Sequence, residues 1–400
     1  MRPFTGKRIL LGITGGIASY KSAWLARLLS KAGAQVDVVM TRAATEFVGA
    51  ITFEALTGRP VHTGLFDAGR ALDHIKLARE ADAIVVAPAT ADFLARAATG
   101  QADDLLSATL LAAGSPVLFV PAMNDHMWAH PQTKQNVAHL RSLGNRVLEP
   151  DEGALAAGEG SGPGRMPEPE IIFAHVSRLL EPAGFGGRRV LVTAGPTREA
   201  IDPVRFISNH SSGRMGVALA AAAWRRGATV DLVAGPLAVP APPGVAVHGV
   251  ESTDDMAAAV ERLLPRSDVL VMAAAPADFR ASAPAALKIK KTESPAPLAL
   301  APTPDILRAT TSARKAGSVI VGFALETNDV LAGGRKKLAG KELDMIVVND
   351  ATEAGAGFGV DTNRVTLLMR DGGEEQLPLM SKADVADAIL DRVEKLIGGR

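Results

Sequence analysis

The sequence contains no cysteine among its 400 residues. Disulfide bonds, zinc sites with thiolate ligands and cysteine nucleophiles are therefore excluded. An excess of either charge is also missing, because Lys and Arg number 43 and Asp and Glu number 43. This balance argues against a nucleic-acid coat or a polybasic membrane anchor, although local basic clusters can still bind phosphates.

Long apolar runs are absent as well. The longest candidate, Thr109–Met123, is interrupted by Ser115, Pro116 and Pro121, whereas a membrane-spanning helix needs about 18 apolar residues. The first residues lack the charged and apolar regions of a signal peptide. We therefore expect a cytoplasmic protein that binds neither membranes nor nucleic acids.

Length and pattern together predict two α/β domains. A single core stops growing near about 250–300 residues. Short apolar runs alternate with alanine-rich helical stretches, which predicts two doubly wound, Rossmann-like domains with mainly parallel sheets and helices on both faces. The expected strands are Ile9–Ile13, Val36–Met40, Ala83–Ala87, Val117–Val120, Arg189–Thr193, Val230–Ala234, Val269–Ala273, Val319–Phe323 and Met345–Val348.

The alternation pauses at residues 184–188, which contain three glycines, and then restarts. We expect domains at residues 1–183 and 189–400, joined by this linker. Residues 153–169 are too polar and glycine-rich for a core element and should form a mobile flap. The proline-rich stretch at 238–245 should be a surface loop.

A glycine-rich turn, Gly12–Ile17, follows the first expected strand and opens a helix. Backbone N–H groups in such a turn can bind a phosphate. The turn is not a P-loop, because Tyr20 occupies the position of the second required glycine, and it is not a G-x-G-x-x-G fingerprint. A tight strand–helix turn without a ligand remains the alternative.

Three further segments follow expected strands at the same edge of the sheet, namely Ala87–Asp92, Gly100–Leu106 and Pro121–Trp128. His74 precedes a helical stretch. It is a candidate acid or base because imidazole ionises near pH 6.5, although a lone histidine is more often structural.

The second half repeats the arrangement. Thr193–Thr197 ends a strand in a glycine turn, and Asn209–Gly216 precedes a helical run. The latter segment is rich in small hydrogen-bonding residues and can hold an anion at a helix N-terminus, with a capped helix as the alternative. Basic clusters near Lys288 and near Lys337 and Lys341 could neutralise a triphosphate, although charge runs are usually solvated.

Over nearly all of residues 1–180, these motifs resemble the phosphopantothenoylcysteine decarboxylases, which are flavin-dependent enzymes of coenzyme A biosynthesis. The resemblance implies an FMN cofactor that takes and returns a hydride around the loss of CO2. It makes His74 and Asn124 the catalytic residues. By the same resemblance, the FMN-binding residues are Gly15, Gly16, Ile17, Ala18, Thr41, Pro88, Ala89, Thr90 and Asp103, and the substrate-binding residues are Met123, Arg165 and Met166.

Two positions depart from the family pattern. Ala157 stands where the family has a flap cysteine that supplies a proton in the reductive step. Glu152 and Glu159 are nearby carboxylates that could substitute, although a solvated glutamate is the simpler interpretation. Asp92 stands where an asparagine is usual, and an ionised aspartate accepts but cannot donate hydrogen bonds.

The motifs from Arg189 to about Ala388 resemble phosphopantothenate–cysteine ligase. The resemblance implies that CTP activates phosphopantothenate as an acyl-cytidylate, which the cysteine amine then attacks. Asn209 and Lys288 would be catalytic, Asp278 would bind Mg²⁺, and Lys337 and Lys341 would lie on a closing loop. The implied substrate-binding residues are Arg205, Ser211 and Ser212, and the implied CTP-binding residues are Ala274, Asp278, Lys288, Phe323, Lys337 and Lys341.

Together, the resemblances predict a bifunctional enzyme that converts 4′-phosphopantothenate, cysteine and CTP into 4′-phosphopantetheine. They also imply a homo-oligomer, with trimeric flavin domains and dimeric ligase domains that could build a dodecamer. One alternative is an active ligase whose flavin domain is impaired because Ala157 replaces the cysteine. A second is a regulatory flavoprotein without turnover, which the intact set of ligase motifs argues against.

Overall fold

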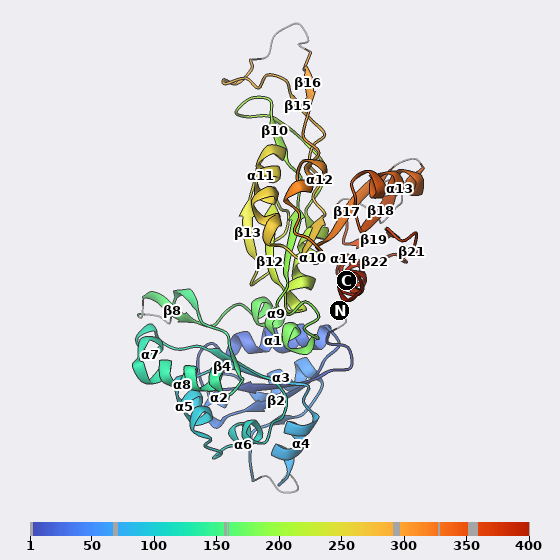
Figure 1. Ribbon diagram of the computed structural model, residues 1–400. Coiled ribbons are helices and arrows are strands. Elements are labelled where there is room, and N and C mark those ends of the chain that lie inside the picture. The colour runs from blue at the N-terminus through green and yellow to red at the C-terminus, as the bar shows by residue number, and fades with distance from the viewer. Residues whose placement is uncertain are drawn as a thin grey trace. The chain divides into compact units, whose positions relative to one another are not determined.

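The computed structural model describes residues 3–66, 71–155, 158, 160–290, 297–326, 329–350 and 359–399, with the side chain of Asp350 left out. The chain divides into two compact units, Met1–Glu181 and Pro182–Arg400 (Figure 1). Each unit is built around its own sheet. No helix in the described part of the chain is long and apolar enough to cross a membrane.

The N-terminal unit contains a six-stranded parallel sheet with the order β3-β2-β1-β4-β5-β6. The central strands are almost entirely buried, as expected for a parallel sheet that is covered on both faces. The strands are β1 (Arg8–Ile13), β2 (Gln35–Met40), β3 (Val61–His62), β4 (Ala83–Ala89), β5 (Val117–Pro121) and β6 (Arg146–Val147).

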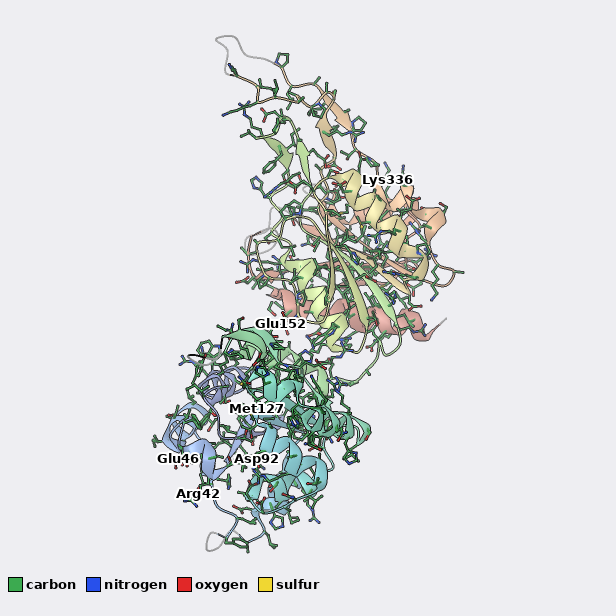
Figure 2. The ribbon with its side chains drawn as sticks, turned by 90° about the vertical axis from the view of Figure 1, so that its left-hand side faces the viewer. Arg42, Glu46, Asp92, Met127, Glu152 and Lys336 are labelled. Atoms are coloured by element: carbon green, nitrogen blue, oxygen red, sulfur yellow. The ribbon has the colours of Figure 1, made fainter. Side chains whose placement is uncertain are left out.

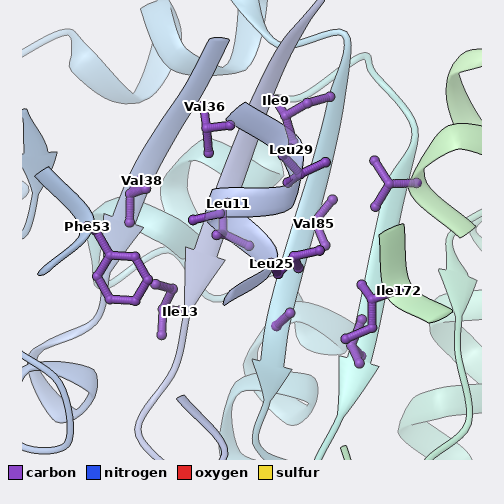
Figure 3. Packing of buried hydrophobic residues seen from close by; sticks show 14 of the residues in the cluster. Ile9, Leu11, Ile13, Leu25, Leu29, Val36, Val38, Phe53, Val85 and Ile172 are labelled. Carbon is purple, nitrogen blue, oxygen red and sulfur yellow. The ribbon is translucent and has the colours of Figure 1, made fainter. Parts of the chain in front are cut away.

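Helices cover both faces of this sheet. On one face, Leu25 and Leu29 pack against Ile9, Leu11 and Val85 (Figure 3). This face carries α1 (Ser19–Lys31), α3 (Ala50–Thr57) and α9 (Pro169–Leu180). The other face carries α4 (Asp73–Glu80), α5 (Ala91–Thr99), α6 (Leu105–Leu111) and α8 (Pro131–Ser142). The short helices α2 (Arg42–Thr45) and α7 (Asp125–Ala129) follow β2 and β5.

The segment predicted as a flap contains strands. Strands β7 (Asp151–Ala154) and β8 (Ser161–Arg165) pair as an antiparallel hairpin. The backbone N–H of Met123 donates to the carbonyl of Gly164 over 3.0 Å. A Cβ at Gly164 would lie 2.2 Å from the Met123 carbonyl oxygen. Glycine at position 164 therefore allows two backbone segments to approach closely. Because glycine is also common in loops, composition alone does not distinguish a hairpin from a loop.

The C-terminal unit contains an eight-stranded sheet with the order β13-β12-β9-β14-β17-β18-β20-β21. Its first six strands are parallel and its last two are antiparallel. The strands are β9 (Arg189–Ala194), β12 (Thr229–Ala234), β13 (Ala246–Gly249), β14 (Val269–Met272), β17 (Val319–Glu326), β18 (Met345–Asp350), β20 (Thr366–Met369) and β21 (Glu374–Gln376).

This sheet is also covered on both faces. One face packs on α11 (Thr253–Leu263), α12 (Ile306–Ala309) and α13 (Val330–Gly340), and the other on α10 (Arg214–Arg225) and α14 (Lys382–Gly398). Short 3₁₀ turns lie at Leu264–Arg266 and Thr311–Ala313. Two-stranded pairs are formed by β10 (Arg198–Ala200) with β11 (Phe206–Ser208), β15 (Phe279–Ala281) with β16 (Leu300–Pro302), and β19 (Thr362–Asn363) with β22 (Met380–Ser381).

The predicted fold class is confirmed, because both units are doubly wound α/β sheets. All nine expected strands are present within a few residues of their predicted ends. The segment 184–188, predicted as a linker, belongs to the C-terminal unit. Phe185 is fully buried, and its N–H donates to the carbonyl of Arg226. Because a glycine-rich segment usually indicates a loop, the sequence did not indicate that Phe185 is buried.

Candidate functional sites

A cavity of about 390 Å³ lies at the C-terminal ends of β1, β4 and β5. Strand order reverses between β1 and β4, and ligands of open α/β sheets bind at such a point. The segments that follow the three strands bring most of the predicted flavin-site residues together. The predicted residues in the cavity wall are Gly15, Gly16, Ile17, Ala18, Pro88, Thr90, Met123, Asn124, Arg165 and Met166.

The turn after β1 is fitted closely to its surroundings. A Cβ at Gly15 would lie 2.4 Å from the Cβ of Ala43, so a side chain cannot be accommodated without movement. No side chain caps the N-terminus of α1, and the helix dipole favours an anion there, although the N–H groups of Ser19 and Lys21 already donate to the carbonyls of Gly16 and Ala18. The Thr14 hydroxyl donates to the Pro88 carbonyl over 2.7 Å and accepts from the Thr90 N–H over 3.0 Å. These bonds fix the two turns together as a cradle that fits a flavin phosphate.

Two cationic side chains of this cavity are held by the chain itself. Lys21, which is 6% exposed, donates to the carbonyl of Met166 over 2.7 Å and to Glu168 over 3.1 Å. Arg165 donates to the same carboxylate oxygen of Glu168. Lys21 therefore anchors the chain that leaves the hairpin. Sequence reasoning missed this role, because Met166 and Glu168 are distant from Lys21 in the sequence.

A second cavity, of about 410 Å³, occupies the equivalent place in the C-terminal unit. It lies beyond β9 and β14, where strand order again reverses. The predicted ligase residues in its wall are Asn209, Ser211, Ser212, Ala274, Asp278, Phe323, Lys337 and Lys341.

The turn into α10 approaches β9 very closely. A Cβ at Gly216 would lie 2.5 Å from the Cβ of Ala194 and 2.7 Å from the Thr193 carbonyl oxygen. The side-chain N–H₂ of Asn209 donates to the carbonyls of Ala275 and Pro276 over 3.2 and 2.9 Å. Asn209 therefore joins the turn before α10 to the turn after β14, which form the two sides of the cavity.

Comparison with known proteins gives a separate family match for each of the two units. Residues 2–181 match the flavoprotein family, and residues 185–397 match the DNA/pantothenate metabolism flavoprotein C-terminal domain. The coenzyme A biosynthesis bifunctional protein CoaBC of Mycobacterium tuberculosis is 49% identical over 409 residues, covering 98% of this chain and 97% of the relative. The chain belongs to the CoaBC family.

A second full-length relative and a solved C-terminal domain also belong to the CoaBC family. The CoaBC protein of Bacillus subtilis is 45% identical over 396 residues, covering 98% of this chain and 97% of the relative. A crystal structure of a CoaBC C-terminal domain is 38% identical, with a TM-score of 0.47, and covers 55% of this chain and 100% of that one. As a CoaBC family member, the chain is a bifunctional enzyme with a flavoprotein-type decarboxylase domain and a ligase domain.

Four predicted flavin-site residues do not reach the first cavity in a single CoaBC chain. Thr41 is buried and caps α2, and Ala89 is buried within β4. Asp103 is paired with Arg96 over 2.8 Å, and this hydrogen bond holds the pKa of the exposed Asp103 carboxyl below its usual value. His74 is half-buried on α4, and its Nδ1 has no hydrogen-bond partner within the described residues.

Asp92, which departs from the family pattern, does not line the cavity either. Its carboxylate pairs with Arg96 over 3.1 Å on the exposed side of α5 (Figure 2). In the single chain, the Asp92 carboxylate is therefore held by Arg96 and does not line the flavin cavity. Glu152 lies exposed on β7 (Figure 2) and is not among the cavity-lining residues. Ala157 and Glu159 lie outside the described residues.

Arg205 and Lys288 do not line the second cavity. Arg205 donates to the carbonyl of Ile289 over 2.7 Å, and the N–H of Ile289 donates to Asp202. Burial acts to raise the pKa of Asp202, but backbone N–H donors and Arg205 outweigh it and lower that pKa. Arg205 and the segment carrying Lys288 are thus held beside each other, on the exposed part of the unit.

Lys337 and Lys341 reach the cavity from a helix, which corrects the expectation of a loop. Lys337 lies within α13, and Lys341 follows its last residue. Leucine, alanine, lysine and arginine favour a helix here despite three glycines. Lys337 pairs with Glu326 over 2.7 Å, and Lys341 pairs with Asp305 over 3.0 Å.

Sequence reasoning missed four polar residues of the second cavity, namely Arg214, Asn349, Asn363 and Lys382. They come from α10, β18, β19 and α14, which are distant in the sequence. Arg214 lies within the segment Asn209–Gly216, which was predicted to hold an anion, but no role was assigned to Arg214 itself. No group of three or more His, Asp or Glu residues suited to a metal occurs among the described residues.

Proposed function

We propose that the C-terminal domain condenses 4′-phosphopantothenate with cysteine at the expense of CTP, and that the N-terminal domain decarboxylates the product to 4′-phosphopantetheine with FMN. The main observation behind this proposal is that motif residues from separate segments meet at one cavity in each domain, where the strand order reverses. Identity of 44–49% with CoaBC proteins over the full chain supports the assignment.

In the ligase cavity, carboxylate activation requires that charge developing on phosphate oxygens be stabilised. Lys337 and Lys341 line the cavity and can exchange their carboxylate partners for a triphosphate. We assign Asn209 to position the acyl-cytidylate relative to the backbone of Ala275 and Pro276. Asp278 is the carboxylate in the cavity wall, and Mg²⁺ is commonly held by one or two carboxylates together with substrate phosphates.

In the decarboxylase cavity, the cradle at Gly15 and Gly16 fits the FMN phosphate. FMN supplies the hydride acceptor and donor for the reaction. We assign Asn124 and Arg165 to orient the anionic substrate, since both line the cavity. Release of Arg165 from Glu168 would free its guanidinium for a carboxylate or phosphate.

We propose that each active site is completed by a second copy of the chain. His74 does not line the flavin cavity, and Arg205 and Lys288 do not line the ligase cavity. Both domains expose large apolar side chains near these residues or cavities, as expected for surfaces that associate. Examples are Ile17 in the turn before α1, Tyr20 and Trp24 on α1, and Phe206, Phe279 and Leu287 in the C-terminal unit.

Mixed oligomers test the second-copy proposal. The His74→Asn and Asn124→Ala variants should each lose CO2 release, whereas a co-expressed mixture should recover a substantial fraction. Recovery requires that one chain supplies His74 and another supplies Asn124. Native mass spectrometry of the same samples would measure the oligomeric state, for which we expect trimeric flavin domains and dimeric ligase domains. Absence of any recovery in a verified mixed oligomer would contradict the proposal.

The decarboxylase assignment is tested by giving the protein 4′-phosphopantothenoylcysteine under anaerobic conditions and identifying the product by mass spectrometry. We expect 4′-phosphopantetheine. The second candidate, an active ligase with an impaired flavin domain, is favoured by Ala157 and predicts unchanged substrate or a decarboxylated species two hydrogens lighter. CTP-dependent release of pyrophosphate in the presence of phosphopantothenate tests the ligase, and its absence would refute that half of the proposal.

A further inference from the structure

Two cations of the ligase cavity stand at the starts of helices. Arg214 is the first residue of α10, and Lys382 is the first residue of α14. Both line the cavity, and Lys382 is only 7% exposed. These helices pack against each other on the same face of the sheet. The structure thus brings two positive side chains and two helix N-termini to one wall.

This arrangement is electrostatically unfavourable without an anion. A helix N-terminus carries a partial positive charge, so a cation at the first helical position is repelled. Burial, and after it the nearby Arg214, lower the pKa of Lys382. Asp361 pairs with Arg214 over 2.5 Å, but its side chain is 84% exposed and its charge is therefore screened by water. The wall accordingly favours a bound anion.

Neighbouring polar groups are also arranged toward the cavity. The ammonium of Lys382 donates to the carbonyl of Val360, which ties residues 359–363 to α14. Asn349 lines the cavity, is 8% exposed and donates to Asn363 over 2.8 Å. Its side-chain oxygen has no hydrogen-bond partner within the described residues. Turning both amides keeps their mutual bond and presents the Asn349 N–H₂ instead, so Asn349 can donate to a ligand.

We propose that Arg214, Lys382, Asn349 and the N-terminus of α10 form a subsite for phosphoryl oxygens in the ligase cavity. The inference rests on the proposed ligase function and adds residues that no sequence motif identified. The subsite is separate from Lys337 and Lys341, which pair with Glu326 and Asp305, whereas Arg214 pairs with the exposed Asp361. Its occupant is either the phosphate chain of the nucleotide or the phosphate end of the pantothenate substrate, since both present the same oxygens.

The experiment compares ligand affinities of full-length variants by isothermal titration calorimetry. Lys382→Met and Arg214→Gln each remove one charge, and Lys382→Arg retains it. Loss of a charge-assisted contact should raise the Kd of the ligand that occupies the subsite by about 10- to 100-fold. Lys395→Met is the matched control, because Lys395 is exposed near the opposite end of α14. This control should change each Kd by less than about twofold.

The ligands distinguish the two sources. A weaker Kd for CTP and for inorganic pyrophosphate assigns the subsite to the nucleotide phosphates. A weaker Kd for 4′-phosphopantothenate alone assigns it to that substrate. Unchanged Kd values for all three ligands in both Lys382→Met and Arg214→Gln overturn the inference.

Thermal unfolding without ligand separates binding from folding. Lys382→Met removes a buried cation from a helix N-terminus but also removes its hydrogen bond to the Val360 carbonyl, so we expect the two effects to offset and the Tm to change little. A lower Tm without a weaker Kd would indicate a structural role alone. If Lys382→Met fails to fold, Arg214→Gln decides, because its side chain is 35% exposed. If wild-type protein binds neither CTP nor phosphopantothenate, the proposed ligase function fails. Pyrophosphate binding that depends on Lys382 would then still support the subsite, and its absence would refute it.

Discussion

The two domains share a strand order and differ in the chemistry of their cavities. Both sheets reverse their order between the first strand and the fourth, and both cavities lie there. The N-terminal cavity is lined mainly by glycine, alanine, methionine and other apolar residues, and its Lys21 and Arg165 are held by Glu168. The C-terminal cavity is lined by four cations and several amides and hydroxyls.

The comparison shows that the shared fold sets the position of the cavity, whereas the side chains on the surrounding loops and helices set its chemistry. An apolar cavity with a backbone cradle suits a large planar cofactor whose phosphate lies at one edge. A cationic cavity suits a substrate that carries several phosphates. Changes that affect one cavity should therefore leave the reaction of the other domain intact, and this independence can be tested.

The largest effect is expected from Gly15→Ala. The new Cβ would lie 2.4 Å from the Cβ of Ala43 and 2.8 Å from its backbone carbon, so the cradle must move. Displacement of about 1 Å in a positioned site costs on the order of 100-fold, and flavin affinity should fall by that factor. Flavin absorbance of the purified protein measures this, while CTP-dependent pyrophosphate release should be retained.

Gly114→Ala, which lies in the same domain but outside the cavity, is the control for that change. Nothing lies within 4 Å of its new Cβ. Flavin content should remain close to that of the wild type. Equal flavin loss in the two variants would show that the tight fit at Gly15 is not the cause.

The reciprocal change is Gly216→Ala in the C-terminal domain. Overlap with Ala194 and Thr193 should displace the start of α10 and destabilise the domain by about 1–3 kcal/mol. Ligase activity should fall at least about tenfold, since misplacement of that start removes cavity contacts. Flavin content should not change. Gly249→Ala, where nothing lies within 4 Å of the new Cβ, should retain activity. Loss of flavin in Gly216→Ala would show that the two domains do not behave independently.

A smaller effect is expected from Lys21→Met in the N-terminal domain. The change removes two hydrogen bonds that hold Met166 and Glu168 and leaves the cavity volume similar. Weaker anchoring of the hairpin should raise the KM for 4′-phosphopantothenoylcysteine by about 3- to 10-fold, which corresponds to roughly one hydrogen bond. Limited proteolysis within residues 151–168 should become faster. An unchanged KM together with unchanged proteolysis would contradict the anchoring role.

The smallest expected difference concerns acid stability. Burial, followed by Arg178 and Arg146, lowers the pKa of His175 on α9 to about 4 from its ordinary 6.5. A folded-state pKa below the unfolded value contributes stability above pH 6.5 that is lost as the pH falls toward 4. In the C-terminal domain, burial acts to raise the pKa of Asp231. Hydrogen bonds from His248 and Arg189 outweigh burial and lower this pKa below its ordinary 3.8. That contribution is lost only at still lower pH.

The N-terminal domain should therefore lose stability first on acidification. Urea unfolding of variants that retain only Trp128 or only Trp224 reports each domain separately, because these residues are buried in different units. Replacing His175 by phenylalanine should reduce the loss between pH 6.5 and 4 in the N-terminal domain. Coincident unfolding of the domains across this range would contradict the predicted difference.

The sequence predicted both sheets because buried parallel strands are continuous apolar runs between turn residues. Most of the predicted site residues line the two cavities, since the segments that follow such strands meet at one edge. The sequence missed Lys382 and Asn349, because their proximity to α10 depends on the packing of elements far apart in the chain. Phe185 and the β7–β8 hairpin were hidden by flanking glycines, which indicate a loop and a close packing contact equally.

The base of the β7–β8 hairpin has a consequence for how the enzyme can diversify. The base of the hairpin is held by backbone contacts, with the Met123 N–H donating to the Gly164 carbonyl and Gly164 packed against the Met123 carbonyl. These contacts do not involve residues 156–159, so exchanges there should leave the base of the hairpin in place. A library that varies position 157 and its neighbours, while the strands stay fixed, is accordingly a direct route to altered substrate scope in this domain.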